Sequence, residues 1–243
     1  MEAISLKAEE LFKVGGFGVT NSLLFTFVVC LILIVFSSIF KGRIRLLPGR
    51  IQGGVEMVFE WFLDLMAGTL GSKEKALRYF PLIATIFTFI LVSNLLGIFP
   101  GVGSLSLTVH EHHIPLFRSP AADLNFTLAF AIISVVAANI LGMAAVGILP
   151  HLGKFFNFKD PIKFFIGILE LVSEFAKVIS LSFRLFGNVF AGEVLLTIIF
   201  SLAPYFIPLP FLFLELFVGL IQAFLFAMLT LVSISLHTTV EEH

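Results

Sequence analysis

The stretch SLSFRLFGNVFAGE, residues 180–193, places Arg184 in the middle of a long apolar segment. A guanidinium stays protonated at physiological pH, and an arginine at the centre of a membrane-spanning helix costs about 2.5–3.5 kcal/mol on insertion scales. On a helix, Ser180 and Asn188 lie one turn to either side of Arg184, and no carboxylate stands at the i+3 or i+4 spacing. We therefore expect the counter-charge to come from another helix or another chain.

The composition around this stretch is that of a membrane protein. Of 243 residues, 58% are hydrophobic and 13% are charged, and the mean hydropathy is +1.08. That is too apolar for a soluble domain. We predict an all-α polytopic membrane protein that forms one integral membrane domain, residues 1–243. It should have about five membrane-embedded helices and one interfacial amphipathic helix, and the last two helices should form a long tilted hairpin.

The net charge and the number of cysteines exclude two classes of function. A net charge of −1 excludes a strongly basic surface for nucleic acid. Cys30 is the one cysteine and lies in an apolar run, so neither a disulfide nor a thiolate metal site is available within the chain. The sequence therefore predicts no nucleic-acid partner and no cysteine chemistry.

Uncharged runs and basic loops set the expected topology. Residues 21–40 carry no charge and match the roughly 30 Å hydrocarbon core. Lys41, Arg43 and Arg45 follow directly, so the positive-inside rule places that loop in the cytoplasm and residues 1–19 outside. Further spans are expected at 80–100, 124–149, 164–203 and 211–236. Membrane helices then occupy residues 20–236, and 237–243 form a cytoplasmic tail. Residues 1–19 do not resemble a cleaved leader, so we expect insertion without cleavage.

Residues 55–66 are too short to span a membrane. Glu56, Glu60 and Asp64 recur every four residues opposite apolar side chains. This pattern predicts a helix lying along the membrane interface, and the alternative is a cytosolic helix packed on the rest of the protein.

Residues 164–203 would measure about 60 Å as one straight helix, twice the thickness of the membrane core. The segment either lies strongly oblique or breaks, and Gly187 and Gly192 are the positions where a bend costs least. Two sets of polar residues recur at a spacing of seven and so share a face: Glu170, Lys177 and Arg184 here, and Glu215 and Gln222 in the next segment.

Ionisable side chains within membrane segments indicate function, but each has a structural alternative. Glu193 and Glu215 form either a proton relay or a buried pair that shares one proton. Glu174, between Glu170 and Lys177, could belong to a surface cluster near the cytoplasmic end.

Two features of the loop before the third span are less specific. The run His110 to His113, with Glu111 inside it, suggests a metal site, but it lacks the i, i+4 histidine pair and fits a solvated loop. Asp123 stands where the N-cap of the third span is expected, and capping alone would explain it.

Three motifs also resemble a known family. SFRLFGNVFAGE (182–193), LIQAFLFAMLT (220–230) and SPAADLNFTLAF (119–130) are similar to subunit a of F-type ATP synthases, the membrane stator beside the rotating c-ring. The likeness covers most of the chain beyond about residue 75. It implies a proton-conducting subunit of a bacterial cell membrane that is not catalytic by itself. It also implies the c-ring, peripheral stalk subunit b and the lipid bilayer as partners, with no cofactor or metal.

The resemblance implies two offset half-channels, one from each side of the membrane, with Arg184 between them. By matching positions, it assigns Asn188, Glu193, Glu215 and Gln222 to the external path, Asp123 to its entrance, and Glu170 and Lys177 to the cytoplasmic path. The chain departs from the family in one respect, because members often have histidine at one of the two positions matching Glu193 and Glu215. This departure leaves sodium open as the coupling ion.

In the family the arginine and the glutamine matching Gln222 are neighbours. A straight hairpin would leave Gln222 about 12 Å nearer the turn than Arg184. A bend after Arg184 would reconcile the two.

Two other classes were weighed. A self-contained transporter or channel could use Arg184 as an anion site, but the halves show no inverted repeat. An intramembrane hydrolase is disfavoured because neither HExxH nor GxSxG occurs.

Overall fold

The computed structural model describes residues 8–45, 47–99, 106–109, 112–155, 161–203 and 205–238. Five helices in these ranges are long and apolar enough to cross a membrane. They are α1 (Asn21–Lys41), α3 (Lys73–Ile98), α4 (Leu124–Val146), α6 (Pro161–Leu202) and α7 (Pro208–Thr238). The predicted all-helical membrane architecture is confirmed, and α3 begins seven residues earlier than expected.

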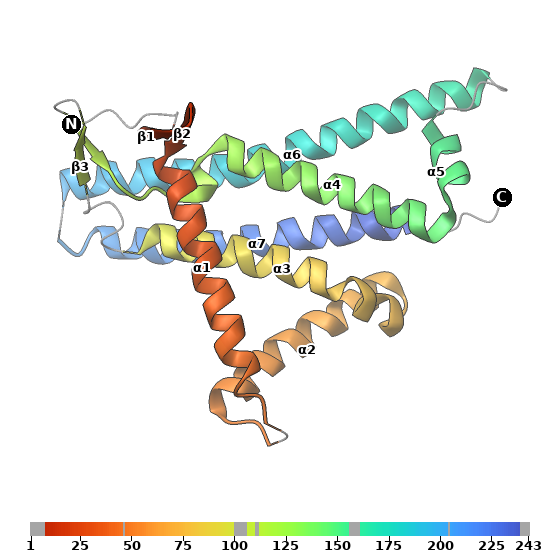
Figure 1. Ribbon diagram of the computed structural model, residues 1–243, viewed down its shortest axis with the longest axis horizontal. Helices are drawn as coiled ribbons and strands as arrows, with labels where there is room; N and C mark the ends of the chain where they lie inside the picture. Colours follow the sequence, from red (N-terminus) through yellow and green to blue (C-terminus); the bar gives the residue numbers. More distant parts are fainter. Residues whose placement is uncertain are drawn as a thin grey trace.

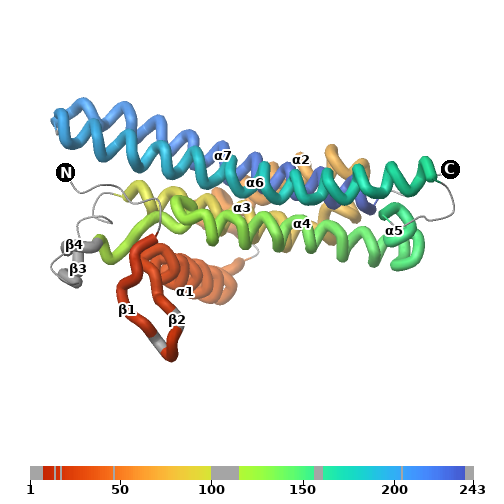
Figure 2. Tube along the Cα trace, turned by 90° about the horizontal axis from the view of Figure 1, so that it is seen from above, coloured from red at the N-terminus to blue at the C-terminus, as the bar shows by residue number. Residues whose placement is uncertain are grey.

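Four of these helices run side by side along the long axis of the molecule. Figure 1 shows α3, α4, α6 and α7 in this arrangement, with α1 crossing them at a steep angle. Figure 2 shows α6 and α7 as one layer over α3 and α4, with α1 on the far side. Fully buried Ile83, Ile90, Leu185 and Leu231 lie in the core cluster of this bundle. The arrangement leaves one face of α6 uncovered by the chain.

The third span ends earlier than the sequence suggested. α4 stops at Val146 rather than at residue 149, because Gly147 adopts a positive φ of 100° that ends the helix. The chain then forms the short α5 (Ile148–Phe155), which packs on α4 and α6. The end of the bundle that carries α5 lies opposite the α6–α7 turn (Figure 1).

α6 is one continuous helix of 42 residues, about 63 Å long. The expected alternative of a break at Gly187 or Gly192 is therefore wrong. Because an unbroken helix of this length is twice the membrane core, it has to lie oblique to the membrane normal.

The amphipathic helix is longer than predicted, since α2 runs from Arg50 to Leu70. Phe62 and Met66 are buried, and the Phe62 ring stacks on Phe87 of α3 with centroids 5.0 Å apart. Met57 and Trp61 remain exposed on the outer side. One face of α2 thus packs on the bundle, and its position at a membrane interface stays a prediction.

Short antiparallel hairpins precede α1 and α4. β1 (Glu10–Val14) pairs with β2 (Phe17–Thr20), and β3 (Ser106–Val109) pairs with β4 (His112–Pro115). A 3₁₀ helix, η2 (Pro120–Ala122), leads into α4. Of the histidine run, His110 and Glu111 lie outside the described residues, and the backbone of the next two belongs to β4.

Close packing of α4 on α7 depends on Gly142. A Cβ at this position would lie 2.7 Å from His237 Cβ and 3.0 Å from the His237 carbonyl oxygen. Gly142→Ala should therefore destabilise the protein by about 1–3 kcal/mol. Thermal unfolding in detergent measures the loss, with Gly68→Ala as the control because nothing lies within 4 Å of a Cβ there. Equal unfolding temperatures for the two variants would contradict the packing.

Candidate functional site

Arg184 lies on the exposed face of α6, beside exposed Phe183 and Ile179. Its Nη2 donates a hydrogen bond to Ser180 Oγ at 3.2 Å, as the one-turn spacing predicts. Within the described ranges no carboxylate stands within ion-pair distance of this guanidinium. The counter-charge was expected from another helix of this chain or from another chain. Among the described residues, no other helix of this chain supplies it.

A pocket of about 350 Å³ lies beside Arg184, between α4, α6 and α7. Hydroxyl groups and one ammonium group line it together with the guanidinium: Ser134, Ser173, Lys177, Ser180, Thr230 and Ser233. This lining can hold water, since water in proteins needs two to four polar partners. The pocket combines these polar groups with apolar side chains and lies next to a cation on an apolar face.

Gln222 is not among the lining residues of this pocket. Glu215 of α7 packs against Gly192 of the antiparallel helix α6. Seven residues further along each helix, Gln222 therefore comes level with Leu185, the residue after Arg184.

Glu193 and Glu215 lie at the end of the bundle that carries the α6–α7 turn. Glu215 packs directly over Gly192, since a Cβ there would be 2.6 Å from Glu215 Oε1. The two carboxylates interact electrostatically from neighbouring helices. A side chain at position 192 would push Glu215 away, so this glycine serves a close approach rather than a bend.

Arg118 is a functional candidate that the sequence analysis missed. Its Nε lies 3.5 Å from Glu193 Oε2, and its guanidinium lies 5.8 Å from the centre of the Phe190 ring. The side chain is only 7% exposed, although it comes from a loop. A signal was present, because Arg118 is the one basic residue between positions 101 and 122. We name Arg118, Glu193 and Glu215 the turn-end cluster.

The loop that carries Arg118 is fixed to α1. Ser22 Oγ donates a hydrogen bond to Asp123 Oδ2, and Asn21 Nδ2 donates to the Pro115 carbonyl at 3.3 Å. Asp123 Oδ1 accepts from the Asn125 backbone N–H at 2.9 Å, which is the predicted N-cap of α4. The capping prediction is confirmed, and the same carboxylate also ties α1 to α4.

A second polar group lies near α5, and we name it the α5-end cluster: Asn139, His151, Glu174, Lys177 and His237. Glu174 Oε1 accepts from Lys177 and lies 3.2 Å from His237 Nε2. Glu174 Oε2 accepts from Asn139 Nδ2 at 3.2 Å, and Asn139 Oδ1 bonds His151 Nε2 at 3.1 Å. Glu174 and Lys177 form an i, i+3 pair, and Glu174 is 9% exposed, so the surface-cluster interpretation is wrong for it.

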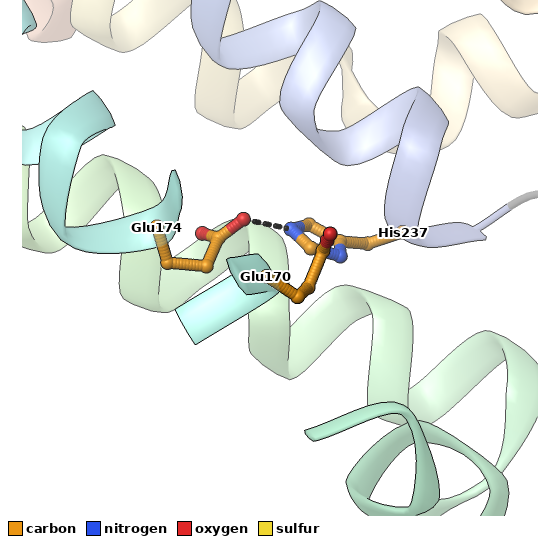
Figure 3. Close-up of side chains that lie close together, drawn as sticks. All are labelled: Glu170, Glu174 and His237. Carbon is orange, nitrogen blue, oxygen red and sulfur yellow. Dashed lines mark hydrogen bonds and ion pairs between the residues drawn. The ribbon is translucent and has the colours of Figure 1, made fainter. Parts of the chain in front are cut away.

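Glu170 adjoins this cluster, as Figure 3 shows. One donor atom each from Glu170, Glu174 and His237 lies within 4.8 Å of the others, and these are ligand types that zinc accepts. The ammonium group of Lys177 already sits on the Glu174 oxygen that faces His237. A metal ion at this position would have to displace the ammonium group of Lys177.

His151 is held in its neutral form. Burial lowers the pKa of His151, and the nearby His237 and Lys154 lower it further, against a smaller opposing effect of Glu174 and Glu170. Since Asn139 Oδ1 accepts, a neutral His151 carries its proton on Nε2, and its Nδ1 has no partner among the described residues. His151 therefore fixes Asn139 without adding charge to the cluster.

The amino-acid sequence is similar to those of known proteins. A family model described as ATP synthase A chain matches residues 23–235. The chain belongs to this family. It is 34% identical over 218 residues to ATP synthase subunit a of Campylobacter concisus (strain 13826), covering 88% of each chain. It is 37% identical over 212 residues to subunit a of Desulfotalea psychrophila, covering 86% of this chain and 80% of the relative. It is 33% identical over 219 residues to subunit a of Geotalea daltonii, covering 89% of this chain and 87% of the relative.

Membership in this family establishes a multi-pass membrane subunit with a role in the F-type ATP synthase and in proton transport. Other subunits of that complex are its partners. The polar groups along α6 therefore belong to an ion-translocating subunit.

The Arg118–Glu193 contact can be tested with a double-mutant cycle. Arg118→Gln and Glu193→Gln should each lower the stability of the purified subunit, and the double variant should lose less than their sum, with a coupling energy of about 0.5–3 kcal/mol. Lys13 and Glu10 form the matched exposed pair, with side chains 71% and 46% exposed. Their cycle should give a coupling near zero. Additive losses at Arg118 and Glu193 would show that the two side chains do not interact.

Proposed function

We propose that this chain is the proton-conducting stator of the synthase, with two offset half-channels that serve the carboxylates of a c-ring and are separated by Arg184. The observation that carries the proposal is the position of Arg184. A permanent cation stands on the exposed apolar face of an unbroken helix, without a carboxylate partner among the described residues. A ring carboxylate from another chain supplies the missing counter-charge.

Electrostatics explain how a contact between Arg184 and a ring carboxylate forms and is released again. Arg184 favours the ionised form of a ring carboxylate that comes opposite it, because an adjacent cation stabilises the anion. The carboxylate releases its proton there and takes one up after moving on, since an ionised group cannot enter lipid. One charge that crosses 100 mV gains about 2.3 kcal/mol, which is enough to bias the direction. The subunit itself forms no bond with a substrate and is not catalytic alone.

Two groups of side chains are proposed to carry protons to and from this contact. On the α6–α7 turn side, Glu193 and Glu215 form the path, Asp123 stands at its entrance, and Asn188 and Gln222 contribute polar groups along it. Toward α5, Lys177 lines the pocket beside Arg184, and Glu170 lies beyond it next to Glu174. Protons rather than sodium are proposed, because the described residues around Arg184 offer mainly hydroxyl and cationic groups. Subunit b of the peripheral stalk is the proposed partner that holds the stator in place.

The rival function, a self-contained transporter with Arg184 as its anion site, requires an enclosed site. Arg184 instead faces outward from α6. No observation on the described residues favours this alternative.

Arg184→Ala tests the proposed role directly. In vesicles with the assembled complex, the variant should abolish proton-driven ATP synthesis and open a passive proton leak, because nothing then separates the two paths. Arg184→Lys should impair synthesis severely, since its compact, strongly hydrated ammonium does not replace the guanidinium. The measurement is proton flux and ATP synthesis with and without the ring. Normal coupled synthesis by the assembled alanine variant would falsify the proposal.

The orientation of the chain follows from its basic residues. Lys41, Arg43, Arg50 and Lys154 lie in segments away from the α6–α7 turn, which predicts that those segments face the cytoplasm. An N-terminal tag should then be cleaved by protease added from the external side of sealed vesicles, and a C-terminal tag only from the cytoplasmic side. The reverse pattern of cleavage would reject this orientation.

A further inference from the structure

The proposed function leaves part of the α5-end cluster without a role. His237 and His151 are 3% and 1% exposed, and Glu174 is nearly as buried. Burying ionisable groups in a membrane bundle is costly, so such groups mark ion pathways more often than structural contacts. The burial of these three side chains therefore indicates a function in ion transfer.

The cluster connects the pocket beside Arg184 to the end of α7. Lys177 lines that pocket and donates to Glu174 Oε1, and the same oxygen lies 3.2 Å from His237 Nε2. His237 is in the last turn of α7, next to the final helical residue Thr238. A hydrogen-bonded chain thus runs from the wall of the pocket to the α5 end of the bundle. Figure 3 shows the Glu174 carboxylate and the His237 ring facing one another within this hydrogen-bonded chain.

We propose that His237 is the proton-exchanging residue between Glu174 and the solvent at the α5 end, an inference that rests on the proposed function. In the outward direction, Glu174 Oε1 takes a proton from a hydronium ion that passes Lys177 at the wall of the pocket, water remains behind, and the carboxyl group passes this proton to His237 Nε2. The imidazolium then releases its Nδ1 proton to water, and the neutral ring that remains carries its proton on Nε2. Exchange with water moves that proton back to Nδ1 before the next transfer. No other bond forms or breaks, and no further reactant is required. Imidazole is the side chain that ordinarily gains and loses a proton between pH 5 and 8, as this step needs.

The groups that face His237 fit this role. From α6 come Glu170, Glu174 and Lys177, and from α5 comes His151, whose ring centre lies 5.4 Å from that of His237. Helix α4 packs Gly142 against His237 and adds uncharged Asn139, which donates to the other oxygen of Glu174. His151 is kept neutral by burial and contacts Glu174 only through Asn139, so it positions the carboxylate and does not carry the proton.

The test is proton flux through the assembled stator and ring in vesicles, measured against the pH on the α5 side. His237→Ala should lower the flux by about tenfold or more and remove its titration between pH 5 and 8. Added imidazole should restore flux, because it supplies the missing proton carrier to the space that the side chain leaves. His151→Ala is the matched control. Its proton flux should keep the pH dependence between pH 5 and 8, and added imidazole should not raise that flux.

Two outcomes would overturn the proposal. The first is a His237→Ala variant whose proton flux, and whose dependence of that flux on pH, equal those of the wild type. The second is a loss of proton flux in an assembled His237→Ala complex that imidazole does not restore, which would indicate a structural role. The result is separable from that of Arg184→Ala. If the arginine variant stayed coupled while His237→Ala still responded to imidazole, the stator proposal would fail and the proton-exchange step would stand.

Discussion

A permanent cation on an apolar helix face is the constraint on which this structure depends. The hydrocarbon region offers no water to solvate Arg184, and the described part of the chain offers a single serine hydroxyl to its side chain. The helix that carries Arg184 is long and unbroken, and hydroxyl groups of α4 and α7 gather in the pocket beside it. The described part of the chain is electrostatically incomplete at this point, and the proposed function assigns the missing negative charge to a carboxylate of another subunit.

Glycines at helix contacts make the rest of the arrangement possible. Gly142 lets α4 approach His237, Gly192 makes room for Glu215, and Gly219 lies against Asn94, whose Nδ2 donates to the Gly219 carbonyl at 3.0 Å. Each contact brings a polar side chain against the backbone of another helix. Membrane bundles lack a hydrophobic driving force between helices, so such close approaches and hydrogen bonds hold them together. The same contacts also set where the ionisable groups meet.

The sequence predicted helices well because apolar runs of about twenty residues have one stable form in a bilayer. It also predicted the Asp123 cap and the position of Arg184 on a shared face with Lys177. It could not predict partners that are distant in the chain. Glu193 meets Arg118, which is 75 positions away, and Glu174 meets His237, which is 63 away.

Two other differences have local causes. The sequence offers Gly192 as a place for a break in α6, but the helix continues through it, and the missing side chain makes room for Glu215 on the neighbouring helix. The end of α4 was placed three residues late, because apolar residues continue past Gly147 into α5 and composition alone does not mark the turn.

The contact between Arg118 and Glu193 has a consequence for biogenesis. During synthesis Arg118 emerges 75 residues before its partner, which at about 5–20 residues per second amounts to roughly 4–15 s. Throughout that interval α4 can enter the membrane, but the guanidinium has no carboxylate from α6 to meet and must wait in the aqueous headgroup layer. The loop that carries Arg118 therefore reaches its final depth only after α6 arrives, so the last helices to be made complete the surface that the earlier ones leave open.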